Sequence, residues 1–454
     1  KGEWKARFGP ELEIREDSGE AISAAKALSA DAIIYPPSEL GALAERRLIK
    51  ALPADWLNRQ ELRKSDLFDP AGLAECQWGE QTFAVPFGSP VFVLIYRRDL
   101  FDRYHLQPPR DWAEYQRIAT TLGEHTKEAG VQTAVIEPLA AGWAGKTLLA
   151  RAAASAKHRD YYATLFDKDT MAPLIDSPPF VRALEELVAA TKGNASLSQA
   201  ASPSDAREAI LSGRAGMAIT WPTAAREASS RSAGRVDYDG RQTESDRLSV
   251  GFAELPGSTQ SFNPKTKAWE SVQAGDDAGS IRREEAQDAN ESARASAPLA
   301  RQNVPLLSIS GRVGSITIES QSPESAFRLL CWLSGDQWSA QICPASPATT
   351  LFRRTHLDKP GQWVEPEIAP GAAKQYAEIV ATSLSRRQWI TCPRIPGAAE
   401  YMAALDDAVR EAIEGKKSAA ECLAAAAKRW QETTKKISVD SQRSAYVRSL
   451  GLEP

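Results

Sequence analysis

The stretch DAIIYPPSELGALAERRLIKALP, residues 31–53, decides the fold class. Its first five residues form an apolar run that ends at two prolines, which is typical of a buried strand. A helical stripe then follows, with Ser38 at the position of an N-cap. Residues 11–14 and 22–28, upstream, have strand and helix character in turn. This strand–helix alternation predicts βαβ units and a parallel sheet.

The alternation of strands and helices continues along the chain and indicates a second lobe. Residues 81–86 and 91–96 are predicted strands on either side of the turn that contains Phe87, Gly88 and Ser89. A helix capped by Asp111 then marks the predicted crossing into the second lobe. Further strands are expected at 133–136 and 215–220, and a helical hairpin at 396–414 and 418–436, with Gly415 between its helices, closes the fold.

Composition narrows the classes of function. The chain has 454 residues, and its 55 basic and 59 acidic residues are interleaved and leave a net charge of −4. Such a surface argues against a nucleic-acid partner. The four histidines and five cysteines show no metal-ligand spacing, and no P-loop, GxSxG or HExxH motif occurs. We therefore expect no metal, no cofactor and no catalytic residue.

Two features leave alternatives open. Cys331 and Cys343 are compatible with a disulfide and equally with buried free thiols. Residues 256–300 are polar and are expected to form a solvated surface insertion, with a partner-docking loop as the alternative.

Four blocks of sequence together resemble the family 1 extracellular solute-binding proteins of ABC importers, which include maltose-binding protein. The blocks are residues 31–53, 83–106 (FAVPFGSPVFVLIYRRDLFDRYHL), 209–222 (AILSGRAGMAITWP) and 393–430 (PRIPGAAEYMAALDDAVREAIEGKKSAAECLAAAAKRW). The resemblance implies a type II-like periplasmic-binding-protein fold of two lobes. Each lobe would hold a mostly parallel sheet flanked by helices, with the ligand cleft between the lobes.

The resemblance also implies boundaries, location and partners. Residues 1–108 and 251–350 would form the N-terminal lobe, and residues 109–250 and 351–454 the C-terminal lobe. A monomer located in the periplasm or outside the cell would deliver its ligand to an ABC permease, either free or lipid-anchored through a removed N-terminal segment. Two departures are expected: the chain starts in the helix after the family's first strand, and the segment 308–312 replaces the usual Gly-Gly-Trp.

Candidate binding residues follow from the chemistry of a carbohydrate, which needs aromatic rings for its C–H faces and planar polar groups for its hydroxyl rim. Trp221 and Trp143 are the predicted rings, and Glu137 the predicted carboxylate after a strand. The resemblance supports Trp221, Glu137 and the start of the closing helix. Packing in the core is the alternative explanation for the rings, and a solvated loop is the alternative for Glu137.

The remaining candidates lie at chain reversals and helix starts. They are Phe87, Gly88, Ser89, Ser38, Glu39, Tyr401 and Met402, for which a tight turn, helix capping or core packing is the alternative explanation.

The sequence therefore predicts a protein that captures a small polar ligand, a carbohydrate, by hinge closure and catalyses nothing. A ligand-sensing surface lipoprotein without a transport role is the first alternative. An enzyme that acts on glycosides is the second, although no carboxylate pair is fixed by local spacing.

Overall fold

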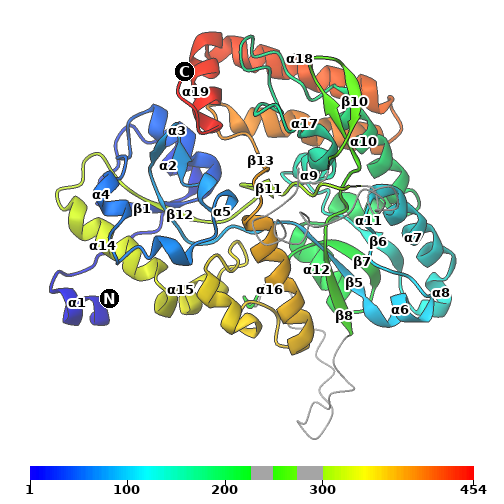
Figure 1. Ribbon diagram of the computed structural model, residues 1–454, viewed down its shortest axis with the longest axis horizontal. Helices are drawn as coiled ribbons and strands as arrows, with labels where there is room; N and C mark the ends of the chain where they lie inside the picture. The colour runs from blue at the N-terminus through cyan, green and yellow to red at the C-terminus, as the bar shows by residue number, and fades with distance from the viewer. Residues whose placement is uncertain (226–248, 274–299) are drawn as a thin grey trace, which may run out of the picture.

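The computed structural model describes residues 1–225, 249–273 and 300–454 and has two lobes that lie side by side (Figure 1). A sheet forms the centre of each lobe, and helices surround it. This is the two-lobed α/β architecture that the sequence predicts.

The first lobe contains a three-stranded sheet in the order β1–β12–β4. β12 (Val313–Ile316) lies between β1 (Ala32–Tyr35) and β4 (Val85–Pro86) and is antiparallel to both. The mostly parallel sheet that we expected is therefore replaced here, among the described strands, by antiparallel pairs. The reason is that β12 re-enters this lobe from the second one, so its first residue lies at the edge where β1 and β4 end.

Short helices and turns complete the first lobe, and Leu40 and Leu43 on its third helix are fully buried in the same core as Tyr35. The helix α1 (Gly2–Phe8) packs on α14 through Trp4 and Trp332, whose ring centroids are 5.5 Å apart. The other elements are α2 (Gly19–Ala24), η1 (Pro37–Glu39), α3 (Leu40–Glu45), α4 (Ala54–Leu57), η2 (Lys64–Asp66), α5 (Ala71–Ala74), β2 (Gln77–Trp78), β3 (Gln81–Thr82), α14 (Pro323–Ser334) and α15 (Asp336–Ile342).

The second lobe contains a four-stranded sheet in the order β6–β7–β5–β8. β6 (Thr133–Ile136) and β7 (Ala215–Thr220) are parallel, whereas β5 (Val93–Arg97) is antiparallel to β7 and to β8 (Val250–Glu254). The surrounding helices are α6 (Arg98–Arg103), α7 (Trp112–Glu124), α8 (Thr126–Ala129), α9 (Ala144–Ala156), α10 (Pro178–Thr191), α11 (Ala195–Ala200) and α12 (Pro203–Leu211). Asp111 caps α7 as predicted, with its side chain accepting a hydrogen bond from the Glu114 N–H.

The strand pairing moves the expected crossing between the lobes. We expected the first lobe to extend to residue 108 and to resume at 251, yet β5 and β8 both belong to the sheet of β6 and β7. The chain passes between the sheets in residues 87–92, the first crossing segment, and returns in residues 308–312, the second crossing segment. An apolar strand such as β5 packs equally well in either sheet, so its hydrophobicity does not reveal the lobe to which it belongs.

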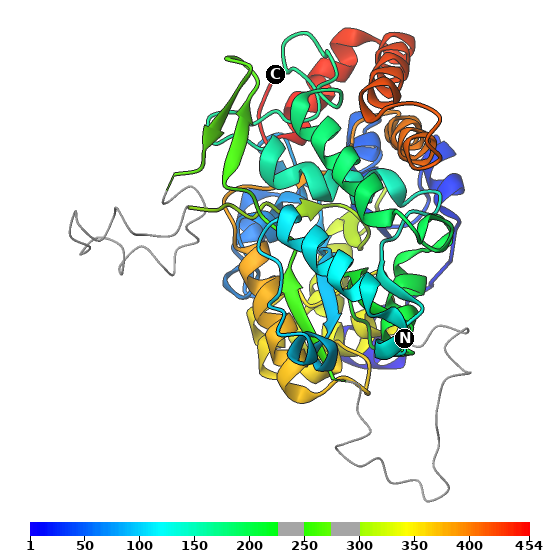
Figure 2. The same cartoon turned by 90° about the vertical axis from the view of Figure 1, so that its right-hand side faces the viewer.

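The start of the polar insertion forms a hairpin, β9 (Gln260–Asn263) and β10 (Ala268–Ser271), which projects from the second lobe (Figure 2). It is held by His158, whose Nε2 lies 3.1 Å from Glu270 Oε2. Just before the hairpin, Ser258 exchanges two backbone hydrogen bonds with Gln302, whose side chain donates to the Ala154 carbonyl at 2.6 Å. The surface insertion expected over 256–300 thus contains a β-hairpin in its first part. Residues 274–299 lie outside the described residues.

The C-terminal region contains α16 (Pro370–Leu384), α17 (Ala398–Ile413), α18 (Ala419–Ile437) and α19 (Val439–Ser449), with β11 (Leu306–Leu307) and β13 (Ile390–Thr391) paired in parallel at the centre. The structure contains the predicted closing hairpin, since Gly415 follows α17 with φ +68° and α18 runs back along α17. The turns η5 (Cys343–Ala345), η6 (Arg354–Asp358) and η7 (Pro360–Gln362) precede α16.

The last helix, α19, contacts both lobes. The Tyr446 hydroxyl oxygen accepts hydrogen bonds from the backbone N–H groups of residues 164, 165 and 166 in the second lobe. Two residues later, Arg448 Nη1 lies 2.7 Å from Glu45 Oε1 on α3 of the first lobe, and the Arg448 carbonyl accepts from the Gly79 N–H. The helix therefore joins the two lobes along one side of the molecule.

All five cysteines, at 76, 331, 343, 392 and 422, are buried free thiols. Cys331 and Cys343 thus form no disulfide, and burial raises the pKa of each to about 12.

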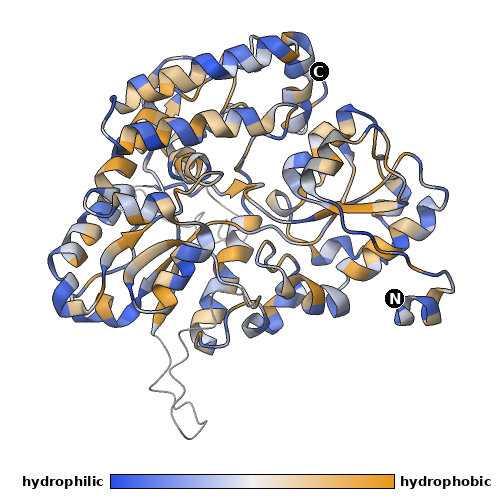
Figure 3. Ribbon diagram, turned by 180° about the vertical axis from the view of Figure 1, so that it is seen from behind, coloured by the Kyte–Doolittle hydropathy of each residue, from blue (hydrophilic) through white to orange (hydrophobic). Residues whose placement is uncertain are grey.

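Hydrophobic residues concentrate on the strands inside the lobes, and polar residues on the outer faces of the helices (Figure 3). Within residues 1–225, 249–273 and 300–454, no helix has both the length and the apolar character needed to cross a bilayer.

Candidate functional site

Three aromatic rings meet where the first crossing segment joins the second lobe. Phe92 lies in that segment, Trp143 directly precedes α9, and Trp221 directly follows β7. Their ring centroids are 5.8 Å apart for Phe92–Trp221 and for Trp143–Trp221, and 6.5 Å apart for Phe92–Trp143. Trp143 is only half-buried, whereas the other two rings are buried. Trp143 is therefore the member of this ring cluster with surface still available to a ligand.

Trp221 lies in the predicted cluster but not in the predicted environment. Its side chain is 3% exposed, and its indole N–H donates to the Pro347 carbonyl at 2.9 Å. Arg207 holds the Trp221 carbonyl through Nη1 at 3.1 Å and pairs with Glu365 at 3.0 Å. We expected an exposed ring on the wall between the lobes; instead, Trp221 supports Trp143 from behind.

Lys146 and the second crossing segment meet beside Trp143. The Lys146 ammonium lies 4.2 Å from the centroid of the Trp143 ring and donates to the Ile309 carbonyl at 2.8 Å. The spacing of three residues at the start of α9 places both side chains on one helical face. Because Ile309 belongs to the second crossing segment, this contact brings that segment against the second lobe.

The carboxylate of Asp406 on α17 binds backbone N–H groups at the N-terminus of α9. It accepts hydrogen bonds from the Gly142 N–H at 2.6 Å and the Gly145 N–H at 2.7 Å. A helix N-terminus attracts negative charge, and here the protein supplies it. Burial raises the pKa of Asp406, and these two N–H groups and Lys146 oppose that rise.

The two predicted binding residues on α17, Tyr401 and Met402, have different environments. Tyr401 is fully buried, its hydroxyl lies 2.8 Å from Thr434 Oγ1, and its carbonyl accepts from the Trp430 indole. It is a core residue, which corrects the prediction. Met402 points to another face of α17, is half-buried, and packs so closely on Gly145 that its Cε would lie 3.1 Å from a Cβ there. Met402 thus joins the surroundings of Trp143.

Glu137 is not at a surface of the second lobe. It is fully buried, its Oε1 lies 2.5 Å from Arg151 Nη2, and it accepts a hydrogen bond from the Tyr115 hydroxyl at 2.9 Å. The predicted ligand carboxylate is instead one half of an internal ion pair behind the loop that carries Trp143.

In the first lobe, the turn after β4 contacts protein rather than open space. Phe87 is a core residue, and Gly88 adopts φ +93° because a Cβ there would lie 2.3 Å from the Thr350 carbonyl oxygen. Ser89 Oγ lies 2.8 Å from the Ser310 carbonyl oxygen and so joins the two crossing segments. The close approach that we expected from a ligand is made at Gly88 by the chain itself.

Ser38 and Glu39 lie at the end of β1, both half-buried. The helix begins two residues earlier than predicted, as the 3₁₀ turn η1, so Ser38 lies inside this turn and Pro36 takes the N-cap position. The N-cap prediction for Ser38 is therefore wrong. A contact from Ser38 or Glu39 to a ligand stays a prediction.

A buried carboxylate lies under the crossing segments. Glu75 is 4% exposed, accepts from the Ser308 N–H, and has Oε1 3.0 Å from Ser89 Oγ. Burial raises the pKa of Glu75, and Ser89, Ser308 and Arg394 oppose that rise. Glu75 is thus committed to the protein itself.

Arg312 stands at the edge where β1 and β4 end. Its backbone N–H donates to the Gly88 carbonyl and its carbonyl accepts from the Phe87 N–H, both at 3.0 Å. Its half-buried guanidinium donates to the Gly311 carbonyl at 2.7 Å. Only glycine fits at position 311. Its φ is +105°, and a Cβ there would lie 2.4 Å from Ser89 Oγ.

Sequence reasoning missed Phe92, Lys146, Asp406 and Arg312. Lys146 could have been found from the sequence, because it follows Trp143 by three residues and so lies on the same face of a helix. The other three reach the site through contacts between segments far apart in sequence, which one sequence does not reveal.

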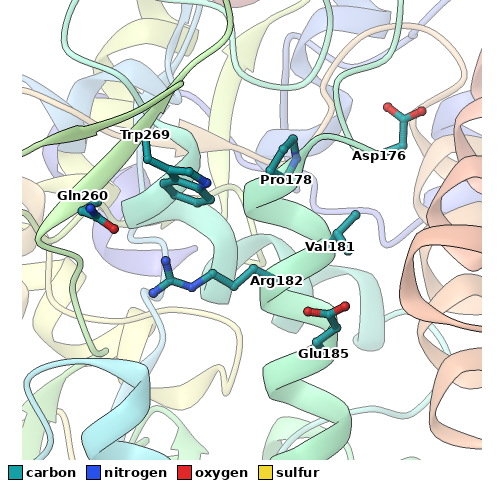
Figure 4. Close-up of a pocket in the computed structure, with 7 residues that line it drawn as sticks. All are labelled: Asp176, Pro178, Val181, Arg182, Glu185, Gln260 and Trp269. Carbon is teal, nitrogen blue, oxygen red and sulfur yellow. The ribbon is translucent and has the colours of Figure 1, made fainter. Parts of the chain in front are cut away.

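A separate hollow of about 470 Å³ lies on the outer side of the second lobe, between α10 and the β9–β10 hairpin (Figure 4). Trp269 from the hairpin faces α10, and the Arg182 guanidinium lies 5.3 Å from the centroid of its ring. The other lining residues are Asp176, Pro178, Val181, Glu185 and Gln260. This hollow does not include the ring cluster.

Comparison with known proteins supports the two-lobed fold. Maltose-bound MalE3 of T. maritima superposes with a TM-score of 0.58 at 16% sequence identity, covering 91% of this chain and 86% of that chain. An ABC transporter solute-binding protein from Agrobacterium radiobacter K84, in complex with ribitol, gives a TM-score of 0.62 at 18% identity, covering 96% and 94%. No curated protein matches the chain.

Residues 18–240 match the family model of the bacterial extracellular solute-binding proteins. This stretch includes β1, both segments that carry Trp143 and Trp221, and the first crossing segment. The resemblance seen in the sequence is thereby confirmed: residues 18–240 match the bacterial extracellular solute-binding protein family, and the chain has the two-lobed fold of ABC-transporter binding proteins.

Proposed function

We propose that this protein captures a small polar ligand, a carbohydrate, against Trp143 and between the two lobes, and delivers it to an ABC permease. The observation that carries the proposal is the ring cluster, in which a half-buried indole is backed by two buried rings. Such a ring stacks on the C–H face of a sugar, and rigid support from behind keeps it in position.

The surroundings of Trp143 also suit a carrier whose lobes close on a ligand. Trp143, Met402 and Lys146 come from the second lobe, whereas Ser89 and Arg312 lie on the crossing segments. A ligand that contacts both groups stabilises the closed arrangement over the open one by the free energy of the added contacts. Two solved relatives of the same fold hold maltose and ribitol, which supports a polyhydroxylated ligand.

We further propose that the protein works as a monomer outside the cytoplasm, tethered by a lipid. The match of residues 18–240 to a family of extracellular solute-binding proteins supports a location outside the cytoplasm. Catalysis has no part in the proposal, because Glu137, Glu75 and Asp406, the carboxylates described around the ring cluster, are committed to contacts with the protein.

The proposal is tested by calorimetric titration of the purified chain with a panel of sugars and polyols that includes maltose and ribitol. We expect Trp143→Ala to weaken the binding of the best ligand about 10- to 100-fold, the scale of a lost aromatic anchor. Trp269→Ala, the same change on the outer hairpin, is the matched control and should leave the affinity unchanged.

An unaltered affinity in the Trp143 variant, with the fold intact by circular dichroism, would remove the ring cluster from the site. Incubation with chromogenic glycosides addresses the enzymatic alternative, because turnover would refute a pure carrier.

A further inference from the structure

We infer that the ligand carries a negative charge, a carboxylate or phosphate on a sugar, which Arg312 and Lys146 receive. This inference rests on the proposed function and specifies the class of its ligand. It depends on two half-buried cations, one carried by the second crossing segment and one bonded to it, and among the described residues neither has a carboxylate partner.

Arg312 is the first of these cations. Within the described ranges 1–225, 249–273 and 300–454, its guanidinium forms no ion pair, and its side chain donates only to the neighbouring Gly311 carbonyl. Burial alone lowers the pKa of Arg312, which means that no charged side chain offsets the loss of water. A guanidinium has five N–H donors, so most of its hydrogen-bonding capacity is uncommitted within the protein.

Lys146 is the second cation. Its ammonium has three N–H donors, and one of them goes to the Ile309 carbonyl. Burial lowers the pKa of Lys146, and Cys392 and Asp406 oppose that change without forming an ion pair with it. Ile309 precedes Arg312 by three residues in the second crossing segment, so Lys146 contacts the same short segment that carries Arg312.

The acidic groups around this segment are committed elsewhere. Asp406 is bound by the Gly142 and Gly145 N–H groups, and Glu75 by Ser89 and the Ser308 N–H. Lys146 and Asp406 lie next to Trp143, and Arg312 adds a second positive charge three residues from Ile309, the backbone partner of Lys146. Partly desolvated charge is costly unless it is paired, and a ligand anion would supply the missing partner.

Both cations suit an anionic sugar rather than a bare anion. Arginine binds carboxylate or phosphate oxygens through two parallel N–H donors, and Lys146 adds a point charge next to the Trp143 ring. The ring then receives the sugar face while the charge is held at the crossing segment. A neutral sugar uses the ring but leaves the cations unpaired.

The experiment compares charged and neutral forms of the same sugars. Glucuronate, galacturonate and glucose 6-phosphate are titrated against glucose and galactose at low and at high salt. We expect at least one acidic probe to bind at least about 10-fold more tightly than its neutral counterpart, with the difference shrinking as salt rises. The uronates and the sugar phosphate separate the two possible anionic groups.

Variants then assign the effect. Arg312→Gln should remove most of the preference for the acid, because it weakens binding of the acidic sugar far more than binding of the neutral one. Arg312→Lys should retain part of the preference, because it keeps the charge. Arg103→Gln, on the outer helix α6, is the matched control and should change neither affinity.

The outcomes are distinguishable. Equal affinities for acidic and neutral sugars, unaffected by Arg312→Gln, would overturn the inference and leave the proposed function standing. Failure of every sugar to bind, charged or neutral, would overturn the proposed function and this inference with it.

Discussion

Replacing Glu137 with alanine is expected to lower the free energy of unfolding by about 3–5 kcal/mol, the usual cost of removing one partner from a buried ion pair. Arg151 would keep its charge with a side chain that is 1% exposed. The guanidinium also lies 3.8 Å from the centroid of the Trp112 ring, so it has no short path to water. Urea unfolding followed by circular dichroism measures the loss.

Two further variants test the reason for this loss. Glu378→Ala breaks an exposed pair with Lys374 and should cost less than about 1 kcal/mol. The double variant Glu137→Leu/Arg151→Met removes both charges and should recover much of the lost stability. A Glu137→Ala protein as stable as the parent would show that water reaches Arg151, contrary to its burial.

Tyr446→Phe is expected to lower the free energy of unfolding by about 2–4 kcal/mol, because several buried N–H donors lose one acceptor. The donors are the backbone groups of Thr164, Leu165 and Phe166, at 3.2, 3.2 and 3.3 Å from the hydroxyl oxygen. The ring is only 5% exposed, so water does not easily replace the hydroxyl. Thermal and urea unfolding of the variant measure the effect.

The same chemical change at an exposed tyrosine provides the control. Tyr162 is 67% exposed, and Tyr162→Phe should alter stability by less than about 0.5 kcal/mol. A Tyr446→Phe protein that unfolds like this control would mean that α19 contributes little to the attachment between the lobes.

The sequence predicted the elements that local pattern determines. The strand at β7, the helix capped by Asp111, and the closing hairpin at Gly415 all occur where spacing and capping residues indicate. Trp143 was predicted as a ligand ring because it lies one short turn after the strand that ends before Glu137; it does lie in the ring cluster, and its contact with a ligand stays a prediction.

The failures share one physical cause, which is contact between distant segments. Glu137 follows a strand as predicted, yet nothing nearby in the sequence says that Arg151 and Tyr115 enclose it. Ser89 meets Ser310, which is 221 residues away, so the crossing segments are visible only in three dimensions. The assignment of β5 to the second sheet failed for the same reason, since its partners are β7 and β8.

The burial of the native thiols has a practical consequence for measuring lobe motion. A thiolate is the form that reacts with maleimide reagents, and thiols such as Cys331 and Cys343, with a pKa of about 12, remain protonated and enclosed at neutral pH. Dyes should therefore attach selectively to one cysteine introduced on the surface of each lobe. The distance between such dyes, followed by energy transfer during titration with a sugar, would report closure while every native cysteine stays in place.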